Sequence, residues 1–173
     1  MYKSETLIHG LLFSRGFTNM LLNDFQTTED WLSRPHDRAN HAMWFTGHIG
    51  LTDNSVIGML DPAQADRRPE FGDLFGRGST PSDDPSDYPT PKEIRAWMED
   101  RRNVLIKIIE MLAEEDFSQP TPPSAPDFLQ TIGQALQFLP WHEGMHSGQV
   151  TVPHRALGHS PLADRPQQEA ANA

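Results

Sequence analysis

The sequence contains no cysteine among its 173 residues. A chain without cysteine has no disulfide, no thiolate metal ligand and no cysteine nucleophile of its own. Any metal ion that the protein binds must therefore be held by histidine, aspartate or glutamate side chains.

Positive charge is also scarce. There are 14 Lys and Arg residues against 24 Asp and Glu residues, which gives a formal net charge of −10 at pH 7. Binding of nucleic acid depends mainly on Lys and Arg side chains that neutralise phosphates, and the sequence shows no basic patch. We therefore expect no nucleic-acid partner.

Long apolar runs are absent as well. No stretch approaches the roughly 18 consecutive apolar residues that suggest a membrane-spanning helix. The first residues, MYKSETLIHG, lack the basic segment and apolar core of a signal peptide. The sequence therefore predicts a cytoplasmic protein without a membrane partner.

Apolar residues recur at spacings of three and four along most of the chain, which indicates amphipathic helices. Four long helices are expected, over residues 4–28, 39–60, 90–114 and 131–156. The segment between the second and third, residues 62–90, is rich in Pro, Asp, Ser and Gly and is interpreted as a long crossover loop with one short helical turn near residues 71–75. Because no segment has a strand pattern, the expected fold class is all-α, a four-helix bundle.

Several residues mark the ends of these helices. Ser4 is the expected N-cap of the first helix. Thr90 and Glu93 form a capping box at the start of the third helix, with proline between them at the first helical position. Gly158 is the expected C-cap of the fourth helix.

Two prolines interrupt the pattern of the fourth helix. A proline inside a helix lacks an N–H and crowds the carbonyl four residues back. Pro140 therefore predicts a kink near Leu136, and Pro153 predicts an early end or a second bend near Gln149. We expect residues 1–160 to form one bundle domain and residues 161–173 to be a mobile tail.

Three histidines are expected to face the core. His142 and His146 are four residues apart, which places both rings on one helical face, although this spacing alone is weak evidence for a site. His48 lies between Trp44 and Leu51 on the apolar stripe of the second helix. A buried imidazole needs hydrogen-bond partners or a metal, and three of them are most easily satisfied together around one ion.

Two short stretches resemble a known family. Residues 44–49 (WFTGHI) are similar to an element of the second helix in the DinB/YfiT-like superfamily, W-x-x-G-H followed by a hydrophobic residue. Residues 142–150 (HEGMHSGQV) resemble its fourth-helix element H-x-x-x-H-x-G-Q followed by a hydrophobic residue, and residues 155–158 (RALG) resemble the R-x-L-G that often closes that helix. Pro140 and Pro153 depart from the family pattern, which more often continues the helix at these positions.

The resemblance implies a four-helix bundle, commonly dimeric, that holds a divalent metal through His48, His142 and His146. It also implies membership of a family that includes transferases and isomerases acting with low-molecular-weight thiols such as bacillithiol or mycothiol. The family name refers to induction by DNA damage, and the net charge of −10 does not support DNA binding.

Three histidines on one ion leave positions for water or substrate. A bound water would support hydrolysis, and a bound thiolate would support S-transfer. Zinc or nickel is favoured, and iron or manganese are alternatives. The family resemblance implies a small-molecule substrate, with a low-molecular-weight thiol as a co-substrate. Two other hypotheses stay open. One is a non-catalytic binding or dimeric interaction module, and the other is a metal-free hydrolase that uses Ser147 beside His146.

Other residues near these motifs have expected roles. His41 and His9 are interpreted as solvent-exposed, although both are candidates for contact with the site. Gln149 either orients His146 or is a polar residue at the end of the bundle, and the sequence does not choose between the two. Glu143 is expected to be solvated, because adjacent residues on a helix point about 100° apart.

The remaining aromatic and charged residues have simpler interpretations. Trp44, Trp97 and Trp141 are expected to fill the core. The other histidines and the acidic pair of the crossover loop are expected at the surface, namely His36, His154, His159, Asp83 and Asp84.

Overall fold

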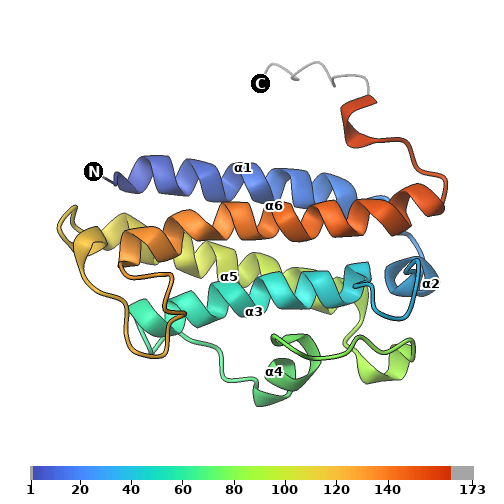
Figure 1. Ribbon diagram of the computed structural model, residues 1–173, viewed down its shortest axis with the longest axis horizontal. Helices are drawn as coiled ribbons and strands as arrows, with labels where there is room; N and C mark the ends of the chain where they lie inside the picture. Colours follow the sequence, from blue (N-terminus) through green and yellow to red (C-terminus); the bar gives the residue numbers. More distant parts are fainter. Residues whose placement is uncertain (1, 165–173) are drawn as a thin grey trace.

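The structure, a computed structural model, describes residues 2–164, and these residues contain helices, turns and loops but no strand. Four long helices run side by side along the molecule (Figure 1). They are α1 (Ser4–Leu22), α3 (Ala42–Leu60), α5 (Pro91–Met111) and α6 (Ile132–Ala156). The prediction of an all-α fold is confirmed.

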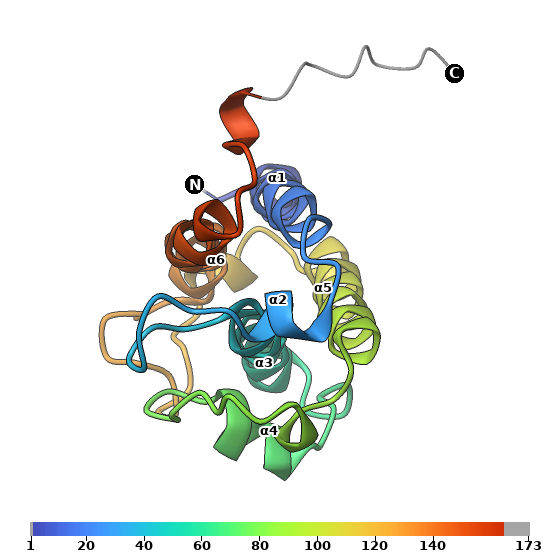
Figure 2. The same cartoon turned by 90° about the vertical axis from the view of Figure 1, so that its right-hand side faces the viewer.

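The end-on view in Figure 2 shows how these helices surround a common core. α1 packs against α6, and α3 packs against both α5 and α6. α4 (Pro69–Phe75) lies against α3 on the side away from α1, and α2 (Thr28–Leu32) lies across one end of the bundle. The long connection between α3 and α5 therefore contains α4 where a short helical turn was expected near residues 71–75, and the helix begins two residues earlier than that turn.

The N-terminal region differs from its prediction. α1 ends at Leu22, earlier than expected, and its N-cap is Lys3, which makes no side-chain hydrogen bond, so the assignment of Ser4 as the cap is wrong. α2 lies in a stretch that was expected to be loop. Its capping box joins Thr27 and Asp30, whose carboxylate accepts a 2.9 Å hydrogen bond from the Thr27 amide. A helix of five residues is too short to show an apolar repeat, so periodicity missed it.

The starts of the later helices agree better with local sequence signals. Thr90 and Glu93 form the expected capping box at the start of α5, and the Glu93 carboxylate accepts a 2.9 Å hydrogen bond from the Thr90 amide. Thr131 opens α6 in the same way. α3 begins at Ala42, later than the expected residue 39.

α6 is continuous through both of its prolines, so the early end expected near Gln149 is wrong. Pro140 lies against α1 at Gly10, where an added Cβ would lie 3.4 Å from the Pro140 Cγ. Burial of this helix face against α1 offsets the lost backbone hydrogen bonds, because tertiary packing supplies most helical stability in proteins. The kink near Leu136 and the alternative of a second bend near Gln149 stay predictions. Gly158 has a φ of 91° just past the helix, as expected of a C-cap glycine.

The segment after α6 is described only in part. A 3-10 turn at Leu162–Asp164 occupies the beginning of the predicted mobile tail. Residues 165–173 of that tail lie outside the described residues. The domain boundary at residue 160 stays a prediction.

Two clusters of buried apolar side chains fill the bundle. Each long helix contributes side chains to both clusters. Along each helix, a buried charged residue separates the residues of one cluster from those of the other. The first cluster includes Leu21, Ile49, Met98 and Val150. The second cluster includes Leu11, Ile57, Leu105 and Leu136.

The charged residues between the clusters form one connected group, which we call the charged layer: Arg15 of α1, Asp53 of α3, Arg102 of α5 and Glu143 of α6. All four are at most 3% exposed. Arg102 donates to Asp53 and to Glu143, each at 2.8 Å. Arg15 donates to the same two carboxylates, at 3.1 Å and 2.8 Å. Alternating charges therefore join all four long helices at one level.

Glu143 is the residue whose environment differs most from its prediction, since it is 1% exposed and was expected to be solvated. Burial alone would raise its pKa, but the guanidinium groups of Arg15 and Arg102 hold the pKa of Glu143 below its ordinary value. The angle of about 100° between adjacent residues of a helix correctly predicted that Glu143 and His142 point to different faces of α6. The sequence could not show that two arginines from other helices lie on the face where Glu143 points.

We expect replacement of Asp53 by alanine to destabilise the protein strongly. Arg15 and Arg102 would then share one buried carboxylate, and breaking a buried ion pair typically costs about 3–5 kcal/mol. Urea denaturation followed by circular dichroism measures the change in the free energy of unfolding. The matched control is Asp73→Ala on the exposed surface of α4, which should change stability by about 0.5 kcal/mol or less. A loss below about 1 kcal/mol for Asp53→Ala would contradict the structural role of the charged layer.

Candidate metal site

Three imidazoles converge where α3 and α6 lie next to each other. The Nε2 atom of His142 lies 3.3 Å from Nε2 of His48 and 3.2 Å from Nε2 of His146. His48 comes from α3, and the other two come from successive turns of α6. The two helices therefore bring together the three residues that the family resemblance implies as metal ligands.

Hydrogen bonds at the opposite ring nitrogens set the tautomer of two of these rings. His48 Nδ1 donates to the carbonyl oxygen of Phe75 at 2.7 Å, and His146 Nδ1 donates to the amide oxygen of Gln149 at 2.9 Å. Carbonyl oxygens only accept, so each Nδ1 carries the hydrogen and each Nε2 keeps its lone pair. Of the two roles open for Gln149, contact with His146 is the one observed.

Burial keeps the three imidazoles uncharged. Burial, together with the neighbouring imidazoles, lowers the pKa of His48 to about 4 and the pKa of His142 to about 3. The pKa of His146 is also lowered by burial. Neutral imidazole is the form that binds metal ions, so at neutral pH the lone pairs are available without loss of a proton.

The donor atoms fit a divalent cation. A hydrogen on His142 Nε2 could serve only one of the two lone pairs that face it, whereas a cation at their common centre would accept all three. Tetrahedral coordination with metal–nitrogen bonds of about 2.0–2.1 Å places the nitrogens about 3.3 Å apart. The measured separations of 3.2 Å and 3.3 Å match this spacing.

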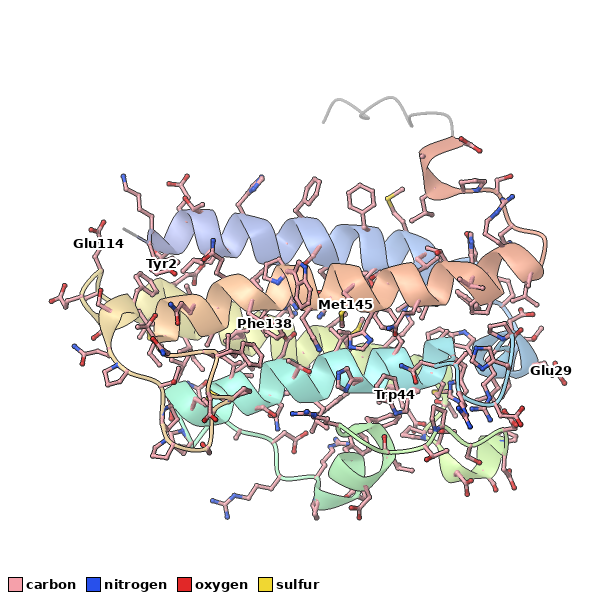
Figure 3. The ribbon with its side chains drawn as sticks, in the orientation of Figure 1. Tyr2, Glu29, Trp44, Glu114, Phe138 and Met145 are labelled. Atoms are coloured by element: carbon pink, nitrogen blue, oxygen red, sulfur yellow. The ribbon has the colours of Figure 1, made fainter. Side chains whose placement is uncertain are left out.

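Contacts around the rings hold them in position. The Trp44 ring stacks on His48 with centroids 4.5 Å apart and an interplanar angle of 12°. Phe138 lies against His142 at 5.1 Å, and the buried Nδ1 of His142 has no hydrogen-bond partner in residues 2–164. Figure 3 shows Trp44 and Phe138 on the side of the molecule where α3 and α6 are adjacent. Ring packing therefore positions His142, whereas hydrogen bonds position the other two histidines.

His41 does not lie at the surface, contrary to its favoured interpretation. It is fully buried at the N-cap of α3, where its Nδ1 accepts the backbone N–H of Trp44 at 3.0 Å. Its Nε2 lies 3.0 Å from the carbonyl oxygen of Ser82. His41 thus supports the helix that carries His48 without contacting the three-histidine site itself. His9 and His36 are exposed, as expected.

His154 was also expected at the surface, and this expectation is wrong. It is 1% exposed, and its Nε2 lies 2.6 Å from the carboxylate of Asp24. His159 stacks on it with ring centroids 4.8 Å apart. In residues 2–164 these three form a second group whose potential ligand atoms lie within 4.8 Å of one another. No sequence pattern connected Asp24 with a histidine 130 residues away.

Two other sequence-based interpretations need correction. Trp141 is 61% exposed and does not fill the core, although Trp44 and Trp97 are buried as expected. Ser147 lies 3.1 Å from the hydroxyl of Thr18 on α1, and both ring nitrogens of His146 have other partners. The geometry therefore gives no support to a Ser147–His146 hydrolase.

A cavity of about 590 Å³ opens beside the three histidines. Its volume falls within the range of small-molecule binding sites. Apolar side chains form most of the wall, among them Val56, Met59, Leu129, Phe138 and Leu139. A ligand in this cavity would contact the imidazole cluster directly.

Four long helices with three convergent histidines define a helical protein with a candidate divalent-metal site between two of its helices. The chain belongs to the DinB superfamily, whose family model matches residues 12–150, a span that contains all three histidines.

Comparison with solved structures supports the same fold. A DinB-like protein of Bacillus subtilis, YjoA, superposes with a TM-score of 0.64 at 18% sequence identity, over 91% of this chain and 95% of that protein. No curated protein matches the chain. None of the helices in the described residues combines the length and apolar character that crossing a membrane requires.

A metal ion held by the three histidines should be bound more weakly when Gln149, which is not itself a ligand, is removed. Removal of the group that accepts the Nδ1–H of a ligating histidine typically lowers metal affinity 10–100-fold. Gln149→Ala should show a loss of this size in competition titrations with a chromophoric chelator, and Gln149→Glu should retain affinity because a carboxylate also accepts this hydrogen. Gln137→Ala, an exposed glutamine on the same helix, is the matched control. Equal affinities of Gln149→Ala and the wild type would show that the hydrogen bond to His146 has no such role.

Proposed function

We propose that this protein binds a divalent metal through His48, His142 and His146 and uses it in S-transfer from a low-molecular-weight thiol or in hydrolysis. The observation that carries the proposal is that His142 Nε2 lies 3.2–3.3 Å from Nε2 of both other histidines, beside an open cavity. A structural zinc site is usually closed by a fourth protein ligand, whereas three protein ligands leave a position for a reactant. In residues 2–164, the group of potential ligands at this site consists of these three histidines alone.

The metal would supply Lewis acidity that lowers the pKa of a bound thiol or water. The chain contributes neutral nitrogen ligands, the hydrogen bonds to Phe75 and Gln149 that orient two of them, and an apolar wall that limits access of bulk water. In S-transfer, the thiol sulfur forms a bond to an electrophilic carbon, and the leaving group departs with its bonding electrons and gains the thiol proton. In hydrolysis, water takes the place of the thiol.

Three imidazole ligands are compatible with several first-row metals. Nitrogen ligands suit zinc, nickel and iron, whereas manganese binds more readily to oxygen. We therefore place zinc and nickel ahead of iron and manganese as the resident metal.

We also infer that the protein forms a homodimer through the exposed apolar face of α1 and α6. Large apolar side chains on this face are strongly exposed: Leu12 at 53%, Phe13 at 63%, Phe17 at 46% and Trp141 at 61%. They adjoin an apolar groove of about 520 Å³ between the two helices. Large exposed apolar patches mark interaction sites, and a two-fold dimer would cover the same face on both copies.

The ligand assignment is tested by His48→Ala. Loss of one of three ligands should reduce bound metal from one equivalent to a trace after gel filtration, as measured by elemental mass spectrometry. His36→Ala, which removes an exposed histidine, should retain a full equivalent. A fully loaded His48→Ala protein would show that the ligand assignment is wrong. Activity with thiols that survives complete removal of metal would contradict the catalytic part of the proposal and favour a binding module.

The dimer is tested by Phe17→Glu. A charge in the middle of the apolar face should convert a dimer into a monomer in sedimentation velocity experiments, because an unpaired carboxylate is costly to bury. Met111→Glu introduces the same charge at a residue of α5 that is 72% exposed and should leave the dimer intact. A wild-type chain that sediments as a monomer, or a Phe17→Glu variant that remains dimeric, would contradict this interface.

A further inference from the structure

The cavity beside the three histidines has an uneven distribution of charge. Within residues 2–164, Arg77 is the only residue besides the histidines that lines this cavity with an ionisable side chain. The rest of the wall consists of apolar side chains, glycines and hydroxyl groups. A single cation therefore faces a mostly apolar cavity in a chain whose net charge is −10.

Arg77 lies in a tight turn whose backbone depends on its two flanking glycines. A Cβ on Gly76 would lie 2.2 Å from the carbonyl oxygen of Gly72, and Gly78 has a φ of 88°. The turn closes with a 3.1 Å hydrogen bond from the Ser79 amide to the Gly76 carbonyl. This turn therefore sets the backbone conformation around Arg77.

The same turn is fastened to the histidine site on both sides of Arg77. Before it, the carbonyl of Phe75 accepts the hydrogen bond from His48. After it, the Ser79 hydroxyl accepts a 2.8 Å hydrogen bond from the indole N–H of Trp44, whose ring stacks on His48. These two hydrogen bonds thus fix the backbone of Arg77 in space relative to the candidate metal ligands.

The guanidinium of Arg77 is available to a ligand. It makes no ion pair or hydrogen bond within residues 2–164, and the residue is exposed at the cavity. Two hydroxyl groups of the wall are already used as donors, because Thr52 donates to the carbonyl of His48 and Ser55 donates to the carbonyl of Leu51. The wall therefore offers few hydrogen-bond donors to a ligand with many hydroxyl groups, whereas the Arg77 guanidinium can pair with an anionic group.

We propose that the cavity binds a small molecule with an apolar body and one terminal carboxylate, which pairs with Arg77 while the body lies against the apolar wall. This inference rests on the proposed function: in the S-transfer reaction, this ligand is the electrophile that accepts the thiol sulfur. A guanidinium binds a carboxylate through two parallel hydrogen bonds. One cation balances one negative charge, so a doubly charged phosphoryl group would leave excess negative charge in an acidic protein.

The experiment compares phenylacetate, phenylpropionate and phenylbutyrate with the corresponding alcohols by isothermal titration calorimetry. The full chain is used both metal-loaded and after treatment with a chelator, so that binding through Arg77 is separated from binding to the metal. Arg77→Met keeps the length of the side chain and removes its charge. Arg67→Met, an exposed arginine outside the cavity, is the matched control, and Met59→Gln tests the apolar wall.

We expect the best-fitting acid to bind the metal-free wild type at least tenfold more tightly than its alcohol, a difference of about 1.4 kcal/mol, because the alcohol cannot form the charged hydrogen-bonded pair with Arg77. Arg77→Met should abolish this preference and leave the affinity for the alcohol unchanged, and Arg67→Met should behave as the wild type. Met59→Gln should weaken binding of acid and alcohol by the same factor.

Several results would overturn the inference. They are an absence of saturable binding by all three acids, a preference for acid that persists in Arg77→Met, and tighter binding of phenyl phosphate than of the acids. A metal-free protein that prefers the acids through Arg77 but never binds a metal would contradict the proposed function and leave this ligand class standing. A metal-loaded, active protein without the preference would contradict the ligand class alone.

Discussion

The charged layer is the interaction on which the arrangement of the helices depends. Buried ions are tolerated only when they are paired and hydrogen-bonded, and here each long helix supplies one member of a single connected group. Sliding one helix by a turn, about 5.4 Å, would move its charge into one of the two apolar clusters. The layer therefore sets the relative height of α1, α3, α5 and α6. Glu143 directly follows His142, and Asp53 lies five residues after His48, so the same constraint brings the histidines of α3 and α6 to one level.

A second constraint comes from the connection between α3 and α5. The carbonyl at the end of α4 orients His48, and the turn that follows carries Arg77 to the mouth of the cavity. A segment that looks like an irregular loop in the sequence thus contributes both to the geometry of the donor atoms and to the charge seen by a ligand. Because the Trp44 indole ties this turn back to α3, the two contributions are coupled.

Features of the sequence that act over one or two turns of chain predicted the structure well. The apolar repeats located the four long helices, and the capping box at Thr90 located the start of α5. The spacing of His142 and His146 correctly placed both rings on one face of α6. Errors arose where a residue's environment comes from another helix, because no local pattern indicates that Glu143 meets two arginines or that His154 meets Asp24. α2 was missed for a different reason, because it is too short to show a repeat.

By itself, the sequence determined that the chain is helical, that a metal could be held only by histidine or carboxylate ligands, and that three histidines lie on apolar helical faces. These properties follow from residue chemistry and from the 3.6-residue period of the helix, both of which are local. Only the tertiary structure decided that His142 Nε2 lies 3.2–3.3 Å from Nε2 of His48 and of His146, that the Phe75 carbonyl and Gln149 fix two tautomers, and that Arg77 lines the cavity. The physical reason is that contacts between helices depend on their relative height and rotation, which are set by the packing and the buried charges of all four helices together.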